Sequence, residues 1–475
     1  MAFKYGTASD LQDLYESLVD FLTGAAESDD PVYVGTGNGT LDDFRCLPGS
    51  PTETWTLTAT SSTNFTVTGS VSGAQAAATV GTPYANAFIT FTLTAGGTAF
   101  VSSDEFTIDV VESPLETAGQ AWVQVGEYLA TDTPVYNLQS GSTLTIPTHF
   151  AKPGLAVKET WTITVISATE ATVSGTVSGA QANLFQNTTY DNGIISLFSS
   201  TGTWVPGDIV TIEVVHYGTA LKGLGLSGTD EIHINLRPFL DPGNGRYSIN
   251  FRGALGYDAG STMAAQPNTT AEVILPTWNG STPYWFYANG RRFIPVWQAS
   301  TVYLSGYFGW ILPFGLPAEH PLPLYVAGGT AYNTVAYDSG NSDLRGFFDP
   351  AYNAAFLNLP GNTWLPIYNY SSSGSPTDYV ALVNNVWPWG PRNTSFMFGN
   401  MREGIDGASR MPIQGVIHGS GVGGGSYGAL DGVFFVQGFN GVSPEDTYVD
   451  GGDTYRIFNN VFRLETDDFV AIKEE

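Results

Sequence analysis

The sequence predicts an all-β protein that contains two tandem β-sandwich repeats, a larger C-terminal antiparallel β-sandwich or jelly-roll-like domain, and one short N-terminal helix. One stretch of the chain occurs twice at a constant offset, and a fixed self-similarity indicates repeated structural units. Apolar residues alternate with Thr and Ser through most of the chain, which is typical of half-buried antiparallel strands. Apolar residues follow the spacing of a helix convincingly only near the N-terminus. The length of 475 residues is enough for several domains.

Two short sequence words, in the same order, mark both copies of the repeat. They are ETWTLT and VSGAQA at 53–58 and 71–76, and ETWTIT and VSGAQA at 159–164 and 177–182. The offset is constant, because Trp161 minus Trp55 is 106 and Gln181 minus Gln75 is 106. The match extends to the acidic strand starts at Asp104 and Asp208, where the offset is 104. The lost residues fall near a glycine turn, where deletions are tolerated.

The copies define two modules, at residues 31–112 and 134–217, joined by a linker at 113–133 that carries a strand near 120–125. Each module has about the length of an immunoglobulin-like sandwich. The chain has a single cysteine, Cys46, so neither module has the disulfide of a true immunoglobulin domain. We therefore predict two immunoglobulin-like β-sandwiches without disulfides.

Residues 1–30 are predicted to form an amphipathic helix followed by an acidic loop. Ser9 and Gln12 match a capping box, the helix runs to Leu22, and Gly24 supplies its C-terminal stop. Apolar residues at helical spacing form a stripe along one face of this helix, and the stripe either docks on its own domain or inserts into a neighbouring subunit of an assembly. Its defining residues are Leu11, Leu14, Leu18 and Phe21.

Residues 218–475 again read as β-structure, with a hairpin as their clearest local signal. Asn289-Gly290 separates two apolar runs, and this pair is typical of a type I′ turn with positive φ at both positions. Four tryptophans surround the hairpin. We expect these side chains either to be buried in the core or, where two of them are exposed as a pair, to stack on sugar rings. These are Trp278, Trp285, Trp297 and Trp310.

The composition excludes several function classes. The formal net charge is −27, which disfavours nucleic-acid binding and anionic membrane surfaces. No apolar run of transmembrane length and no secretory signal is evident, and a lone cysteine suits a reducing cytoplasm. Charged residues are 13% of the chain, a low share typical of β-rich surfaces that pack against other protein.

Motifs for catalysis or cofactors are weak. Residues 223–228 match G-x-G-x-x-G, but a strand-like run follows instead of the helix that a dinucleotide site needs. Residues 424–428 match G-x-S-x-G without the strand and helix of a nucleophile elbow. No histidines have metal-ligand spacing. We predict no enzyme and no cofactor, with Ca²⁺ as an open alternative to a solvated turn at four acidic residues. These are Asp450, Asp453, Asp467 and Asp468.

The order of these parts resembles virion structural proteins of tailed bacteriophages. The resemblance covers most of the chain and rests on structural words, so it transfers no catalytic or binding residue. The words are 6–11 (GTASDL), 18–23 (LVDFLT), 118–122 (AGQAW), the two ETWT…VSGAQA modules, 284–292 (YWFYANGRR) and 430–436 (LDGVFFV).

The resemblance implies a protein of the tail or baseplate that is assembled in the host cytoplasm. Its expected partners are further copies of itself in a symmetric oligomer and other virion proteins. A capsid decoration protein is one alternative. A receptor-binding adhesin that holds host-surface glycan is another, and an enzyme such as a polysaccharide depolymerase comes last.

Overall fold

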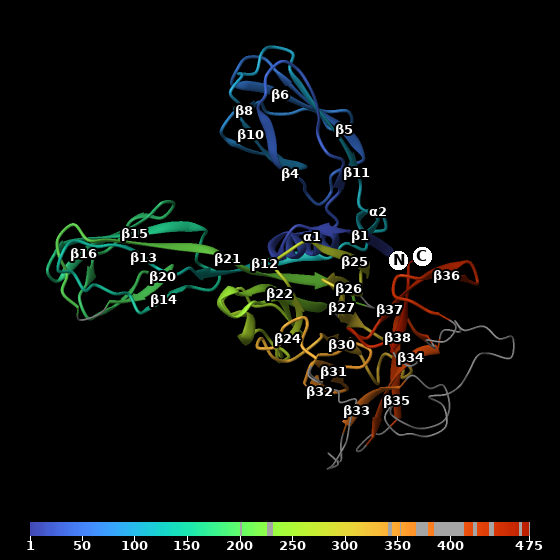
Figure 1. The fold of residues 1–475 in the computed structure, drawn as a ribbon. Coiled ribbons are helices and arrows are strands. Elements are labelled where there is room, and N and C mark those ends of the chain that lie inside the picture. Colours follow the sequence, from blue (N-terminus) through green and yellow to red (C-terminus); the bar gives the residue numbers. More distant parts are fainter. Residues whose placement is uncertain are drawn as a thin grey trace.

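The structure is a computed structural model, and it confirms a mostly-β chain with antiparallel sheets and a short N-terminal helix. Strands hold 51% of the residues and helices 6%. The residues that it describes are 1–199, 202–225, 231–340, 344–351, 353–366, 379–383, 413–420, 425–436, 441–464 and 468–474. Figure 1 shows two arms, at residues 27–111 and 123–217, extending in different directions from a larger body.

The two modules are built from corresponding strands. Module one contains β2 (Glu27–Ser28), β3 (Val32–Val34), β4 (Thr40–Cys46), β5 (Glu53–Ala59), β6 (Asn64–Gly69), β7 (Gly73–Ala74), β8 (Ala78–Thr79), β9 (Pro83–Ala85), β10 (Ile89–Thr94) and β11 (Glu105–Val111). Module two contains β12 (Val123–Thr131), β13 (Val135–Asn137), β14 (Thr148–Ala151), β15 (Glu159–Ser167), β16 (Glu170–Gly175), β17 (Gly179–Ala180), β18 (Leu184–Phe185), β19 (Thr189–Asp191), β20 (Ile195–Phe198) and β21 (Ile209–Gly223).

The same sheet orders occur in both modules. One sheet runs β4-β10-β9 in module one and β14-β20-β19 in module two. The other runs β11-β5-β6-β7 and β21-β15-β16-β17, with β3 and β13 on the far side of β11 and β21. Trp55 and Trp161 are both fully buried and lie opposite Gly69 and Gly175 in their ladders. The repeated words therefore specify the same register twice.

Module two differs from module one in how it joins the body. Strand β21 crosses residue 217, the predicted end of the module, and continues to Gly223. Its first half pairs with β15, and its second half pairs with β22 of the body. Strand β12, which lies in the predicted linker, runs beside β21 along most of this length. Module two thus shares one unbroken sheet with the body (Figure 1).

The body also includes the N-terminal segment. Its elements are β1 (Ala2–Ala8), α1 (Leu11–Thr23), α2 (Pro114–Thr117), β22 (Ile232–Asp241), the 3₁₀ turns Pro242–Asn244 and Met263–Ala265, β23 (Arg246–Ala254), β24 (Val273–Thr277), β25 (Thr282–Asn289), β26 (Arg292–Ala299), β27 (Val302–Ser305), β28 (Tyr307–Trp310), β29 (Leu312–Pro313), β30 (Leu324–Ala327), β31 (Ala355–Leu359), β32 (Thr363–Pro366), β33 (Tyr379–Val383), β34 (Ile413–Ser420), β35 (Gly425–Val436), β36 (Thr447–Asp450), β37 (Asp453–Asn459) and β38 (Phe469–Lys473). Strand β1 pairs with β25, so the first residues of the chain lie in the central sheet.

The central sheet, β1-β25-β26-β28-β30-β31-β32, is buried on both faces. Tyr284 and Phe286 pack towards β22–β24 and α1, whereas Trp285 and Tyr287 pack towards β35, β37 and β38. A two-layer sandwich or jelly roll was the sequence-based expectation, but the described part of the body has three sheet layers. The reason is visible in β25, whose aromatic residues occupy consecutive positions and therefore need an apolar partner on each side.

The N-terminal cap of helix α1 differs from the prediction, whereas its C-terminal stop agrees with it. The helix is capped by Asp10, whose side chain accepts from the Asp13 N–H at 3.0 Å, and not by Ser9. Gln12 bonds instead to Glu16, one turn further along the helix. The predicted stop at Gly24 is confirmed, since its φ is 76° and its N–H bonds to the carbonyl groups that end the helix.

The hairpin between β25 and β26 forms as predicted, but its turn lies one residue later. Asn289 pairs with Arg292 as the last ladder position, so Gly290 and Arg291 make the turn. Asn289 Oδ1 accepts from the N–H groups of Arg291 and Arg292. Neither Gly290 nor Arg291 has positive φ, so the turn is not type I′.

Candidate ligand pocket at the junction of module two and the body

Three of the four predicted tryptophans are core residues. Trp285, Trp297 and Trp310 are 6%, 0% and 3% exposed. Trp297 donates its Nε1–H to the Pro276 carbonyl at 2.9 Å, which satisfies the buried indole. Trp278 is half-buried, donates to Thr282, and lies with its ring near Tyr337. The structure does not bring these tryptophans together as an exposed pair.

The helix stripe is also core. Leu11, Leu14, Leu18 and Phe21 are at most 3% exposed and pack against β22, β23 and β25 of the same chain. Of the two alternatives for this stripe, docking on its own domain is therefore the one present in the structure.

The remaining motif predictions fall partly outside the described residues. These include residues 226–228 of the G-x-G-x-x-G match, Gly424 of the G-x-S-x-G match, and Asp467. Asp453 pairs with Lys473 at 2.7 Å, and Asp468 is buried and accepts from Asn460. Among the described residues, no group of three or more His, Cys, Asp or Glu side chains could hold a metal ion.

The structure explains why the words ETWT and VSGAQA occur together. The Glu53 carboxylate is buried, and it accepts from the N–H groups of Val71 and Ser72 at 3.0 and 2.9 Å. The Ser72 hydroxyl donates to the same carboxylate at 2.6 Å. A Cβ at Gly69 would collide with this carboxylate, so the ladder position opposite Trp55 must be glycine. ETWT thus supplies the buried carboxylate, and VSGAQA supplies the N–H and hydroxyl groups that bind it. Together they hold the turn.

Module two repeats this contact residue for residue. Glu159 accepts from Val177 and Ser178 at 3.1 and 2.9 Å, and from the Ser178 hydroxyl at 2.6 Å. Gly175 meets the Glu159 carboxylate as Gly69 meets that of Glu53. These groups are fully partnered and structural, so the strongest sequence signal in the chain marks architecture and not a binding site.

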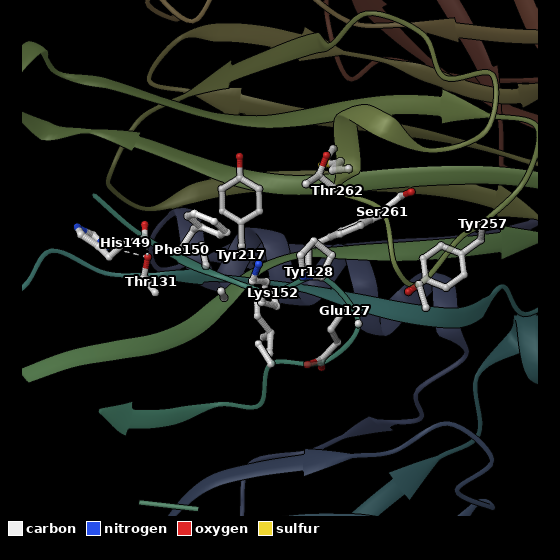
Figure 2. Close-up of a pocket in the computed structure, with 18 residues that line it drawn as sticks. Glu127, Tyr128, Thr131, His149, Phe150, Lys152, Tyr217, Tyr257, Ser261 and Thr262 are labelled. Carbon is white, nitrogen blue, oxygen red and sulfur yellow. Dashed lines mark hydrogen bonds between the residues drawn. The ribbon is translucent and has the colours of Figure 1, made fainter. Parts of the chain in front are cut away.

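The principal candidate site is a pocket of about 730 Å³ between module two and the body. Its lining combines strands β12 and β14 with the segment 257–263 that follows β23. Figure 2 shows Phe150, Tyr217 and Tyr128 in the middle of the pocket, with His149 and Tyr257 towards opposite ends. Residues far apart in sequence therefore meet at the junction, which is a common place for a ligand site.

The aromatic lining leaves ring surface open. Phe150 is 45% exposed and Tyr217 is 37% exposed, whereas Tyr128 is buried and donates its hydroxyl to Asn235 at 2.8 Å. The Lys152 ammonium lies 5.2 Å from the centre of the Phe150 ring, and the Arg237 guanidinium lies 5.1 Å from that of Tyr217. These cation–π contacts hold the two exposed rings in place at the pocket.

The polar lining is varied but carries little free charge. His149 Nδ1 lies 2.8 Å from Thr131 Oγ1, and burial lowers the pKa of His149 below its ordinary value. The imidazole is therefore neutral at pH 7. Lys152 is paired with Asp191 at 2.6 Å. Ser261 and Thr262 add hydroxyl groups from the body side (Figure 2). Glu127 is the one carboxylate among the described lining residues.

The body side of the pocket is held by a buried amide. Gln266 is 3% exposed, accepts from the Asp258 N–H at 2.7 Å, and donates to the carbonyls of Asp258 and Ser261. Gly154 of module two approaches this loop so closely that a Cβ there would collide with the Ala259 carbonyl. Loop 257–263 is thus fixed both from within the body and from module two.

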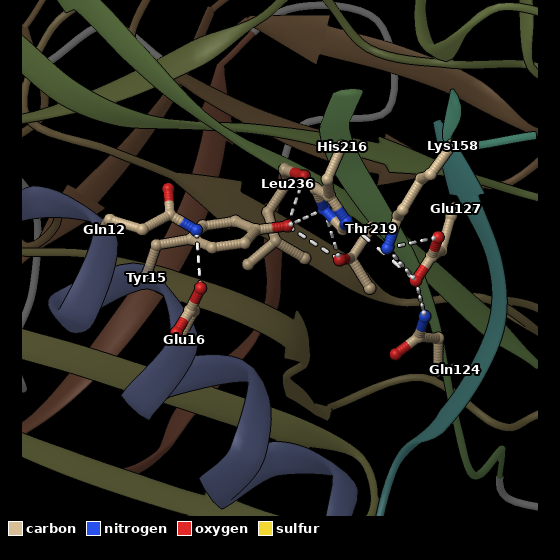
Figure 3. Close-up of polar contacts among 9 residues, drawn as sticks. All are labelled: Gln12, Tyr15, Glu16, Gln124, Glu127, Lys158, His216, Thr219 and Leu236. Carbon is tan, nitrogen blue, oxygen red and sulfur yellow. Dashed lines mark hydrogen bonds and ion pairs between the residues drawn. The ribbon is translucent and has the colours of Figure 1, made fainter. Parts of the chain in front are cut away.

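A polar cluster joins the pocket to helix α1 (Figure 3). Tyr15 contacts Thr219 Oγ1 at 2.7 Å and His216 Nε2 at 3.2 Å through its hydroxyl. Lys158 bonds to the pocket residue Glu127 at 3.1 Å, and His216 Nδ1 lies 3.9 Å from the same carboxylate. Burial lowers the pKa of His216, although Glu127 acts in the opposite direction. The cluster connects module two, the body and α1 at the base of the arm.

Sequence analysis did not find this pocket. Its aromatic residues occur singly, at Tyr128, Phe150, Tyr217 and Tyr257, in segments that show no common motif. The available signal was an aromatic residue at each end of module two, Tyr128 and Tyr217, and this signal has meaning only once strands β12 and β21 are known to enter the body.

Comparison of the chain with protein-family models and with curated proteins gives no match. Among the described residues, no helix has the length and apolar character needed to cross a membrane.

Proposed function

We propose that this protein is a structural component of a tailed bacteriophage virion, most suitably placed in the tail or baseplate, and that it assembles through protein–protein contacts. One observation carries the proposal. Two equivalent modules extend from a three-layer β body, and one of them is an extension of the body's own sheet. Such arms present surface at a distance from the core, as an assembly protein requires. The sequence resemblance described above supports the same class.

We further propose that each module is an immunoglobulin-like sandwich. In that fold, strands B, E and D form one sheet and strands C, F and G form the other. The order β4-β10-β9 corresponds to B-E-D, and β6-β5-β11 corresponds to C′-C-F. The place of G beside F is taken by β3, which is antiparallel to β11 but precedes the other strands in the chain. The same correspondence applies to module two through β13 and β21.

Matching exposed apolar residues support assembly contacts by both modules. Val71 and Val177, in the two VSGAQA turns, are 68% and 70% exposed. Val32 and Val135, on the edge strands β3 and β13, are 62% and 67% exposed. Exposed apolar residues on strand edges and turns are surfaces that a partner can cover. A symmetric oligomer would bring the same surfaces together repeatedly.

A receptor-binding adhesin is the second candidate, and the aromatic junction pocket is the observation that favours it. A capsid decoration protein shares the structural class of the leading proposal. The tail or baseplate component, the decoration protein and the adhesin differ in where the protein lies on a particle and in whether it binds host cells.

The test is immunogold electron microscopy of particles of the phage that encodes the chain, with antibody raised against module two. We expect label at the tail or baseplate. Label on the head would favour a decoration protein. Particles that carry no label and contain no peptide of this chain by mass spectrometry would overturn the virion proposal. Binding of the purified protein to host cells, measured separately, identifies the adhesin.

A further inference from the structure

We propose that the junction pocket between module two and the body binds a neutral oligosaccharide. The inference concerns the isolated chain and does not depend on where the protein lies in a virion. It assigns sugar binding to Phe150, Tyr217 and their neighbours, and not to the tryptophans of the central sheet.

The size and walls of the pocket suit a small ligand. Its volume of about 730 Å³ lies within the range of about 300–1,000 Å³ that is common for ligand sites. Two aromatic side chains border it with open surface, Phe150 at 45% and Tyr217 at 37% exposure. The C–H face of a pyranose ring is apolar and packs on such a ring, which removes apolar area from water.

The polar groups of the pocket select sugar hydroxyls over other ligand chemistries. The Thr262 hydroxyl can both donate and accept. The Ser261 hydroxyl, which donates to Asp258 at 2.7 Å, can still accept, and the Glu127 carboxylate, which is paired with Lys158, has lone pairs left for a further hydroxyl. A phosphate or sulfate ligand would need a cation, but Lys152 is engaged by Asp191 and His149 is neutral at pH 7. The net charge of −27 also repels anionic ligands. A purely aliphatic ligand would shield the Thr262 hydroxyl and the remaining lone pairs of Ser261 and Glu127 from water without offering them a hydrogen bond.

The pocket is organised before a ligand arrives. Gln266 holds loop 257–263 through hydrogen bonds to three backbone groups, and cations hold both exposed rings. Little side-chain or loop entropy then remains to be lost on binding. Because β14 and loop 257–263 form opposite walls, a bound sugar would contact module two and the body together.

The experiment measures binding of the full chain to a panel of neutral oligosaccharides of glucose, galactose, mannose and N-acetylglucosamine, with sialylated and sulfated oligosaccharides for comparison. Isothermal titration calorimetry and saturation-transfer NMR supply the affinities. We expect at least one neutral oligosaccharide to bind at millimolar concentration or below. Phe150→Ala and Tyr217→Ala should each weaken that affinity about tenfold, which corresponds to the loss of one well-placed contact.

The matched control is Phe185→Ala. Phe185 is 51% exposed on β18 of the same module and does not line the pocket, so its truncation should leave binding unchanged. All three variants should melt as the wild type does, because the rings are far from fully buried. Thr262→Trp is a second kind of variant, since it fills the exposed body side of the pocket without removing an aromatic, and it should block binding.

Three outcomes would overturn the proposal: no neutral oligosaccharide binding to the wild type, equal binding by wild type and the Phe150→Ala and Tyr217→Ala variants, or preference for the anionic oligosaccharides. None of these depends on particle localisation, so failure here and failure of the virion proposal are distinguishable.

Discussion

Single buried carboxylates fix the turns and loops of both modules. Glu53 and Glu159 hold the VSGAQA turns, and Asp104 and Asp208 hold the loops at the other end of the same modules. All four are less than 10% exposed and are partnered mainly by backbone N–H groups. Such carboxylates specify loop geometry, because a buried N–H without an acceptor is costly.

The first prediction concerns Glu53→Gln. The amide oxygen can still accept from Val71 and Ser72, and its N–H₂ group can donate to the Ser72 hydroxyl, but a neutral acceptor replaces a charged one, so the turn should open more easily by about 1 kcal/mol. Amide hydrogen exchange of residues 70–76 in the full chain measures this local effect. Glu105→Gln, on the neighbouring strand, is the control and should leave that exchange unchanged. Unaltered exchange in Glu53→Gln would show that the carboxylate does not hold the turn.

The second prediction concerns acid. Hydrogen bonds from the Val101 N–H, then from Thr36 and Gly37, lower the pKa of Asp104 from 3.8 to about 2, against the effect of burial. Folded module one therefore binds fewer protons than the unfolded chain between these values, and its stability should fall as pH drops from about 4 to about 2. In Asp104→Asn this part of the acid sensitivity should be absent.

Hydrogen exchange of module one across this pH range is the measurement, with Asp109→Asn on the outer face of β11 as the control. The control should keep the full acid sensitivity of the wild type. An identical pH dependence for Asp104→Asn and wild type would contradict the assignment.

Among the elements, the central sheet shows most clearly how side-chain alternation becomes packing. Both faces of β25 and β26 are apolar, so each strand contributes to two separate cores. Helix α1 covers part of one core through its stripe, and the hairpin turn at Gly290-Arg291 keeps β25 and β26 in register. The tryptophans at these strands are consequently structural.

The third prediction follows from this placement. Trp297→Ala removes a fully buried indole and its hydrogen bond to Pro276, and it should lower the free energy of unfolding of the body by about 3–5 kcal/mol. Trp285→Ala should behave similarly. Trp278→Ala is the control with a much smaller loss, since this side chain is half-buried. Thermal and denaturant unfolding, followed by far-ultraviolet circular dichroism, provide the comparison. Equal losses at Trp278 and Trp297 would contradict the burial argument.

At the level of the complete chain, the two arms are attached differently. Module one joins through two chain crossings near α2 and through Arg45, which pairs with Glu16 and with Asp20 of α1. Module two is an extension of the body's sheet through β21 and β12. A continuous main-chain ladder resists bending, so module two should keep a defined orientation with its pocket at the base.

The fourth prediction tests this attachment. Thr219 lies in β21 between Glu127 and Leu236, and proline there removes a ladder donor from an interior strand. Spin labels at Ile166→Cys, beside the β15–β16 turn at the end of module two away from the body, and at Leu240→Cys, both exposed positions, report the distance from the tip of module two to the body. We expect a narrow distance distribution in the parent and a broad one in Thr219→Pro. Thr219→Val keeps the strand and should stay narrow. A narrow distribution in Thr219→Pro would show that the ladder does not set the orientation.

The repeat, the strand alternation and the N-terminal helix were all accessible from the amino-acid order. Each depends on neighbours along the chain: Trp55, Leu57 and Ala59 alternate within one strand, and the α1 stripe recurs within one helix. The constant offset between Trp55 and Trp161 was enough to predict that both copies have the same register, because identical words make the same local contacts.

Tertiary structure alone decided the third sheet layer, the passage of β21 into the body, and the pocket. The pocket joins β12, β14, Tyr217 and loop 257–263, and Gly154 closes on Ala259 across more than a hundred residues of sequence. The capping residue and the hairpin turn each moved by one position, since side-chain hydrogen bonds at Asp10 and Asn289 outweighed the local motifs. Contacts between distant segments depend on how whole sheets stack, and periodicity within a segment carries no information about that stacking.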